Sequence, residues 1–302
     1  MRNVQCILCR TTEFEQELYP SNVTEADLNT AVFSARRLPD KLHGRVVRCQ
    51  KCGLVYTNPQ VDTEYLSKLY ERSTYTYEGE EYYIRRTYKR ELGRLLPMLR
   101  DRSTPLSYLD IGCGNGFMLQ AAKELGFADP WGVEPSTHAI ERAHPSVQGL
   151  ILQGMFSLSL LGEKRFDAIS CFQALDHIPD PASFVEEVFR ALKPGGAVLF
   201  VNHNIASLTA RILKERCPMI DIEHTFLHTP STMRSLFERE GFVDIRIHSV
   251  RNDYPLHYWA HLLPAPAWLK KPVMRVLRRS FLGRIVLPLY AGNLGLIARK
   301  PL

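Results

Sequence analysis

The chain has 302 residues, of which 45% are hydrophobic and 23% charged. This balance is typical of a globular protein with one large domain or two smaller ones, and it excludes a disordered or collagen-like chain. The formal net charge is +6, but the last 49 residues contain no acid and eight lysines and arginines, so the remainder is slightly acidic. This excludes a nucleic-acid-binding surface spread over the whole chain. No apolar run follows Met1, so we expect a cytoplasmic protein without a secretory signal.

Two Cys-x-x-Cys pairs lie near the start of the chain, Cys6 with Cys9 and Cys49 with Cys52. Each pair can present two thiolates to one metal ion, and four thiolates suit tetrahedral zinc better than iron. We therefore expect residues 1–60 to form a small zinc-ribbon-like module. Its expected role is to hold together a segment with too little hydrophobic core, and recognition of a substrate or a nucleic acid is the alternative role.

Leu92, Leu95 and Leu99 recur at helical spacing, which predicts a helical linker or lid over residues 61–104. From residue 105 onward, short apolar runs alternate with helical segments, and this alternation predicts a doubly wound α/β sheet. The expected strands are 106–111, 130–134, 149–153, 166–172, 197–202, 243–250 and 294–299. The expected helices are 116–125, 137–143, 182–192 and 230–240.

A glycine-rich loop, Asp110-Ile-Gly112-Cys-Gly114-Asn-Gly116, follows the first of these strands and opens a helix. Its glycines let a ligand lie against the backbone. The spacing differs from that of dinucleotide-binding loops, and an acid at Asp110 suits a cationic amine better than a pyrophosphate. Glu134 ends the next strand, 20 residues after Gly114, where its carboxylate can accept hydrogen bonds from both hydroxyls of a ribose.

The chain resembles the class I S-adenosylmethionine-dependent methyltransferases in five segments that follow one another in the family's order. These segments are 109–116, 131–136, 166–169, 174–181 and 192–196. The resemblance implies an α/β, Rossmann-like fold with a seven-stranded, mostly parallel sheet, helices on both faces and an antiparallel last strand. Residues 105–302 would form this methyltransferase domain.

The resemblance also implies how the cofactor S-adenosylmethionine is bound. Asp110, Gly112 and Gly114 would line its methionine part, and Glu134 would hold its ribose. The alternative is a fold that has lost its ability to bind the cofactor. It is disfavoured because the glycines and both acids are present.

Four further positions complete the expected cofactor site. Ala174 and Leu175 would flank the sulfonium. Many members of the family have Gly-Asp after the third strand, and the acid contacts the adenine amine. This chain has Gly154-Met155-Phe156 instead, so we expect the adenine to rest on Met155, Phe156 and the backbone.

The second cysteine pair carries a looser resemblance. Residues 49–59 read Cys-Gln-Lys-Cys-Gly-Leu-Val-Tyr-Thr-Asn-Pro, which is similar to a subgroup that includes nucleotide-sugar methyltransferases. The resemblance implies a small-molecule acceptor, with a sugar or similar polar metabolite as the first expectation. An RNA-modifying methyltransferase and a non-catalytic, cofactor-binding assembly subunit are the alternatives.

Three histidines are candidate catalytic bases. In open α/β sheets, ligands bind beyond the carboxyl ends of the strands. His203 lies at one such end and His177 after another, and His224 belongs to a polar stretch before the last predicted helix. Histidine suits proton transfer near neutral pH. We rank His203 first as the base; the alternative for each histidine is a structural hydrogen bond.

Apolar and basic residues interleave at helical spacing over residues 265–290. We expect this amphipathic segment to be a helix docked on its own domain. The alternative is an interfacial helix at the inner face of the membrane, which would suit a lipid-linked substrate. A nucleic-acid contact ranks third, because the segment is too apolar for a simple phosphate-binding stripe.

Overall fold

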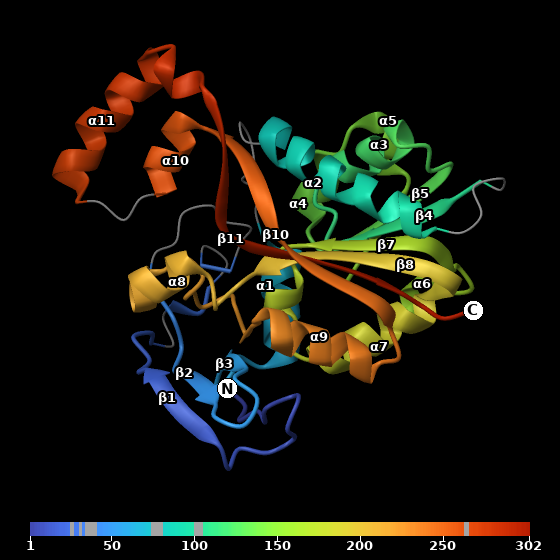
Figure 1. Ribbon diagram of the computed structural model, residues 1–302, viewed down its shortest axis with the longest axis horizontal. Helices are drawn as coiled ribbons and strands as arrows, with labels where there is room; N and C mark the ends of the chain where they lie inside the picture. The colour runs from blue at the N-terminus through green and yellow to red at the C-terminus, as the bar shows by residue number, and fades with distance from the viewer. Residues whose placement is uncertain (25–26, 30–31, 34–40, 74–80, 100–104, 263–265) are drawn as a thin grey trace.

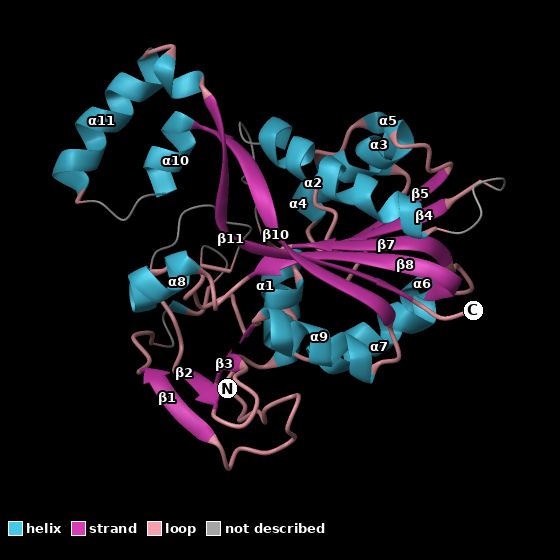
Figure 2. Ribbon diagram, viewed as in Figure 1, coloured by secondary structure: helices cyan, strands magenta, loops and turns pink. Residues whose placement is uncertain are grey.

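The computed structural model describes residues 1–302 except 25–26, 30–31, 34–40, 74–80, 100–104 and 263–265. The described residues form a seven-stranded sheet and a four-stranded sheet, with helices on both faces of the larger one (Figure 1; Figure 2).

The seven-stranded sheet contains every strand that the α/β pattern predicted. Its strands lie in the order β10-β11-β8-β7-β4-β5-β6, and neighbours are parallel except at β11, which is antiparallel to β8 and β10. This confirms the predicted fold, including the antiparallel last strand. The strands are β4 (Ser107–Ile111), β5 (Asp129–Glu134), β6 (Ile151–Gln153), β7 (Phe166–Phe172), β8 (Leu192–His203), β10 (Val243–Pro255) and β11 (Val286–Arg299).

The central strand β4 shows why helices cover both faces of this sheet. All five of its residues are buried; Tyr108 packs in one hydrophobic core and the next residue, Leu109, in a second. A parallel strand whose two faces are both apolar requires such double cover. On the Tyr108 side lie α2 (Glu81–Leu95) and α3 (Phe117–Glu124), and on the Leu109 side lie α7 (Pro181–Ala191) and α9 (Pro230–Arg239). Shorter helices are α4 (Thr137–Glu141), α5 (Pro145–Gln148) and α6 (Leu158–Leu161).

The four-stranded sheet joins the N-terminal segment to the methyltransferase-like part of the chain. Its antiparallel order is β1-β2-β3-β9. The first three strands come from the segment expected to bind zinc, whereas β9 lies between β8 and α9. The strands are β1 (Glu15–Tyr19), β2 (Val46–Cys49), β3 (Val55–Thr57) and β9 (Phe226–Leu227). After β3 comes the helix α1 (Thr63–Glu71), which is capped by Asp62; the carboxylate of Asp62 accepts hydrogen bonds from first-turn amides.

The last two strands continue beyond the sheet as a two-stranded ribbon. Their pairing extends to Tyr254 with Leu287 and Pro255 with Val286. Figure 1 shows this ribbon carrying α10 (Leu256–Leu262) and α11 (Ala267–Arg279) away from the sheet, on the same side of the molecule as α8 (Leu208–Leu213).

The expectation of a docked basic helix is therefore wrong. Trp268 is 77% exposed and Val276 is 64% exposed, and Met274 alone is buried among the α11 side chains that the structure describes. The physical reason is that the ribbon holds α11 beyond the edge of the sheet, where it packs against α10 and the turn that follows it and leaves most of its described apolar side chains exposed. Within the described ranges, no helix is both long and apolar enough to span a bilayer.

Candidate active site

The glycine-rich loop folds as a cradle at the carboxyl end of β4. Gly112 has φ +73°, and a Cβ there would lie 3.2 Å from the Cβ of Ala174. The Gly112 amide donates to the carbonyl of Val133, which holds the loop against β5. A side chain at Gly112 would therefore be both strained and crowded, and its absence leaves backbone exposed to a ligand.

Glu134, at the end of β5, is fixed by the same loop. Its carboxylate accepts hydrogen bonds from the amide of Gly114 at 2.9 Å and from that of Ser136 at 2.8 Å. Burial raises the pKa of Glu134, and the two amide donors partly offset this effect. Each carboxylate oxygen retains acceptor capacity, as binding of ribose hydroxyls would require.

A cavity of about 520 Å³ begins at this loop and extends along the carboxyl ends of β7 and β8. Of the residues expected to bind the cofactor, Gly112, Gly114, Glu134, Met155, Phe156 and Ala174 line it. These lining residues fit S-adenosylmethionine. They supply a glycine cradle, a carboxylate for the ribose, and the apolar side chains of Met155 and Phe156 for the adenine. Leu175 is fully buried and does not contribute to the wall.

Asp110 lies beneath the cradle and does not line the cavity. It is 3% exposed, and its Oδ1 accepts a hydrogen bond of 2.5 Å from the hydroxyl of Ser170. The hydroxyl of Tyr108 in turn donates to Ser170, also at 2.5 Å. Burial raises the pKa of Asp110 to about 7, even though these hydroxyls lower it.

Replacing Asp110 by Asn should therefore stabilise the fold at alkaline pH. A carboxyl group whose pKa is raised in the folded state destabilises that state once the pH exceeds its unfolded pKa of about 3.9. The cost grows up to about pH 7, so Asp110→Asn should increase the free energy of unfolding by about 2–4 kcal/mol at pH 8 and leave it unchanged near pH 4. Thermal melts at the two pH values test this, and an equal effect at both would contradict it.

His203, at the end of β8, is paired with a buried carboxylate. Asp176 lies in a single helical turn after β7 and is 0% exposed. Its Oδ2 accepts hydrogen bonds from Nδ1 of His203 at 2.8 Å and from the His203 amide at 3.0 Å. Burial by itself would raise the pKa of Asp176, but the hydrogen bond and charge of His203 lower it to about 2. Because Nδ1 donates to Asp176, Nε2 of His203 carries the free lone pair.

The structure brings the other two candidate histidines to the same place. The ring of His224 lies 4.6 Å from that of His203 and 4.9 Å from that of His177, and all three line the cavity. Nδ1 of His224 donates to the carbonyl of Met219 at 2.8 Å. Burial lowers the pKa of His224, and the nearby His203 lowers it further, which keeps the His224 ring neutral.

Sequence reasoning missed two members of this cluster. Asp176 stands beside His177 in the sequence but was not expected to orient His203. The hydroxyl of Tyr70, on α1, contacts Nδ1 of His177 at 2.9 Å. Asp176 had a signal, because it follows a strand that neighbours β8. Tyr70 had none, because nothing local shows where α1 packs.

The outer part of the cavity is largely aromatic and aliphatic, and sequence reasoning did not anticipate it. Its walls come from the β10–β11 ribbon, from α10 and from α8. The apolar residues are Tyr254, Tyr258, Trp259, Leu262, Leu289, Tyr290 and Leu213.

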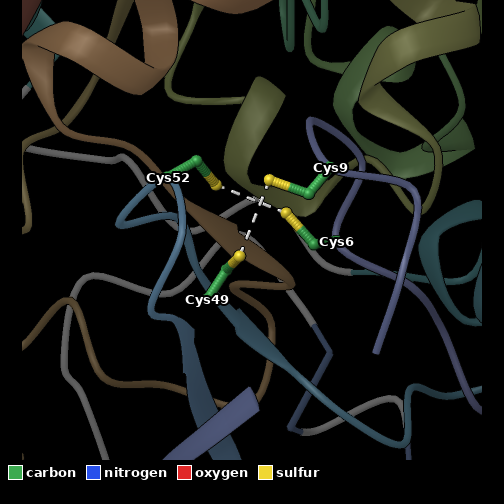
Figure 3. A group of neighbouring side chains, drawn as sticks. All are labelled: Cys6, Cys9, Cys49 and Cys52. Atoms are coloured by element: carbon green, nitrogen blue, oxygen red, sulfur yellow. Dashed lines mark hydrogen bonds between the residues drawn. The ribbon is translucent and has the colours of Figure 1, made fainter. Parts of the chain in front are cut away.

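Four cysteine sulfurs converge in the N-terminal module (Figure 3). All four lie within 4.8 Å of one another; the separation is 3.4 Å between Cys6 and Cys52 and 3.7 Å between Cys9 and Cys49. Four sulfurs bound to one zinc ion at about 2.3 Å would be about 3.8 Å apart. The four thiols therefore fit a closed tetrahedral site, and they are too far apart to be disulfides.

Both cysteine pairs form the same kind of turn. The amide of Arg10 donates to the carbonyl of Cys6 at 2.7 Å, and that of Gly53 donates to the carbonyl of Cys49 at 2.8 Å. Arg10 and Gly53 both have positive φ, at 55° and 81°. This repeated geometry turns each pair of sulfurs inward. It explains the glycine after Cys52, since only glycine adopts such a φ without cost.

Comparisons with known proteins agree with this geometry. The family model described as "Methyltransferase domain" matches residues 81–247, more than half of the chain. Two "Ubiquinone biosynthesis O-methyltransferase" proteins are similar. That of Alkalilimnicola ehrlichii is 34% identical over 113 residues, 35% of this chain and 45% of that protein. That of Methylococcus capsulatus is 36% identical over 150 residues, 45% of this chain and 62% of that protein. The chain thus spans about half the length of the curated relatives it matches.

A solved structure shares the fold. It is a chain of the complex between the Haloferax volcanii Trm112 methyltransferase activator and a methyltransferase, with a TM-score of 0.50 and 19% identity over 74% of this chain and 92% of that chain. The strand order, the glycine cradle and the family match all lead to one conclusion. The chain belongs to the methyltransferase domain family, and it has the S-adenosylmethionine-dependent class I fold that the resemblance implied.

Proposed function

We propose that the protein transfers the methyl group of S-adenosylmethionine to a hydroxyl oxygen of a small molecule, with His203 as the general base. The observation that carries this proposal is the pairing of His203 with the buried Asp176 in the wall of the cavity that starts at the glycine cradle. A base is useful when the acceptor is a hydroxyl, which must lose a proton. The relatives whose names include "O-methyltransferase" also support an oxygen acceptor.

Gly112, Gly114 and Glu134, with Met155 and Phe156, would hold the cofactor. When bound, S-adenosylmethionine supplies an electrophilic methyl group on a sulfonium. The protein's contribution is to align an acceptor with this methyl group and to exclude water.

In the reaction, the acceptor oxygen forms a bond to the methyl carbon while the carbon–sulfur bond breaks. The hydroxyl proton moves to Nε2 of His203. Asp176 stabilises the imidazolium that results and keeps the ring in the productive tautomer. The products are a methyl ether and S-adenosylhomocysteine, and His203 then returns the proton to water. The neutral His224 and the Tyr70-held His177 would position the acceptor oxygen.

The residues that line the outer part of the cavity favour one chemical class of acceptor. Tyr258, Trp259 and Leu289 would bury an apolar body better than a sugar, which needs polar partners for each hydroxyl. The first candidate is therefore a hydroxyl on a largely apolar molecule, such as a phenol. A sugar or similar polar metabolite is the second candidate, supported by the resemblance of residues 49–59 to the nucleotide-sugar subgroup.

The same proposal includes one structural zinc ion bound by the four cysteines. The distances between their sulfurs support it, as does the matched turn at each pair. Such a site is closed to substrate, so its contribution is to folding.

Assays with methyl-labelled cofactor and matched acceptors test the function. We expect transfer to a phenol that carries an apolar tail and little transfer to a nucleotide sugar. Glu134→Gln should weaken cofactor binding by about 1.5–3 kcal/mol, the range for a hydrogen bond to a charged group, and should lower turnover of every acceptor alike. Transfer to amines alone would overturn the oxygen assignment, and transfer to nucleotide sugars alone would establish the second candidate.

A further inference from the structure

One side of the molecule exposes an unusual number of apolar side chains. On α11 and in the turn after it, Trp268 and Phe281 are 77% and 76% exposed. Smaller apolar side chains beside them are also exposed, namely Leu269, Val273, Val276 and Leu282. We call these six residues the α11 surface. An exposed group of this kind indicates an interaction site.

Basic residues accompany the α11 surface, and acids do not. At helical spacing, Leu269, Val273 and Val276 share one side of α11. Exposed Lys271, Arg275 and Arg278 repeat at the same spacing on a neighbouring side. No acid occurs after Asp253. The helix α11 is therefore amphipathic, and all of its charged residues are basic. It complements a partner that has an apolar interior and a negatively charged surface.

The mouth of the cavity lies among the same elements. Exposed Leu289 and Tyr290, on the β10–β11 ribbon, also line the cavity. On α8, Leu208 and Ile212 are 73% and 68% exposed, and the intervening Thr209 lines the cavity. Figure 1 shows α8 on the same side of the molecule as α10 and α11. Exposed apolar side chains thus lie beside the cavity as well as on α11.

We infer that this side of the molecule docks on an anionic lipid bilayer and receives its acceptor from that bilayer. The α11 surface would lie at the boundary between headgroups and acyl chains, with the arginines and lysines at the headgroups. An acceptor with an apolar body would then pass between α8 and the ribbon without crossing water. The bilayer contact stands independently, whereas the membrane-borne acceptor rests on the proposed function.

Vesicle flotation tests the contact. The 302-residue protein should float with vesicles of phosphatidylcholine and phosphatidylglycerol but not with phosphatidylcholine alone. Retention should fall between about 0.1 M and 1 M salt, because the Debye length falls from about 10 Å to about 3 Å. Arg278→Glu with Arg279→Glu should reduce retention at least about tenfold, since each basic residue near such a surface contributes about a factor of five. Val276→Asp should reduce it independently.

A matched control is available on the side of the molecule away from α11, where Figure 1 shows α7 and the start of β10. Arg190, on α7, and Arg246, at the start of β10, are exposed, and reversing both charges changes the net charge as much as the α11 pair does. The control pair should keep wild-type retention. Equal losses of vesicle retention for the two pairs would show that retention depends on net charge and not on α11. Binding of a structured RNA in place of vesicles would assign the surface to nucleic acid. Either result overturns the proposal.

The acceptor part has its own readout. With a short, water-soluble acceptor, the α11 variants should turn over at the wild-type rate, whereas with a tailed acceptor embedded in anionic vesicles they should lose at least about tenfold. Equal turnover of the embedded acceptor by variant and wild type would overturn membrane delivery. Failure of both acceptors in the wild-type protein, with flotation intact, would instead contradict the proposed function.

Discussion

Replacing His203 by Gln should lower kcat by about 10²- to 10⁴-fold, the usual contribution of a positioned general base. Gln is similar in size and polarity but cannot take up the proton of an acceptor hydroxyl. Cofactor binding should be unchanged, because the cradle and Glu134 lie on other strands. Single-turnover rates, together with titration of S-adenosylhomocysteine against thermal stability, separate the two effects.

Asp176→Asn is the second half of this test. Asn would keep the shape of the side chain but would remove the charge that stabilises a protonated His203, and it could stabilise the wrong tautomer. We expect a loss of kcat close to that of His203→Gln, and the double variant should lose little more than either single variant, because the two groups act as a unit.

The neighbouring histidines provide the control. Burial lowers the pKa of His224, and that ring is held by the Met219 carbonyl, so it is a poor base. His224→Gln and His177→Gln should each cost kcat less than His203→Gln does. If His224→Gln abolished transfer and His203→Gln did not, the base would be His224 and the pair with Asp176 would be structural.

The sequence predicted the sheet well because buried parallel strands leave a strong local pattern. The expected strand 166–172 coincides with β7, and the loop from Asp110 to Gly116 opens α3 as expected. His203 and Asp176 could be placed near each other because they follow neighbouring strands. The hydrogen bond between them depends on rotamers that no local pattern contains.

The C-terminal segment shows where sequence reasoning fails. Helical spacing correctly predicted an amphipathic helix over Ala267–Arg279, but the expected segment 265–290 was too long, because its last part belongs to β11. Spacing also does not say what covers the apolar side of the helix. The exposure of that side depends on the pairing of Tyr254 with Leu287, which extends both strands beyond their expected bounds of 243–250 and 294–299. Likewise, the two-residue strand β9 is too short to predict, and it joins the cysteine module to the rest of the chain.

Removing the metal that we propose for the cysteine module should have the largest effect on stability. The purified protein should contain about one zinc ion per chain, and Cys49→Ser should lower the metal content and unfold the module, because closed zinc sites contribute folding free energy directly. Cys217→Ser, which removes a buried thiol outside the cluster, should leave the metal content at one. A metal-free, stably folded protein with four titratable thiols in this module would contradict the prediction.

Metal loss should also reduce activity, although none of the four clustered cysteines lines the cavity. Strand β3 pairs with β9, and Tyr56 stacks on Phe226 with ring centroids 5.8 Å apart. The residue before β9, Thr225, donates its amide to the Asp176 carbonyl at 2.7 Å and its hydroxyl to the same carbonyl at 3.0 Å. A module that unfolds withdraws β3 from this sheet and frees the turn that holds Asp176 against His203. We therefore expect chelation to lower kcat at least about tenfold, as a misplaced catalytic group does, before the seven-stranded sheet melts. Zinc added back should restore kcat, and unchanged kcat in metal-depleted protein would show that Asp176 is held without β9.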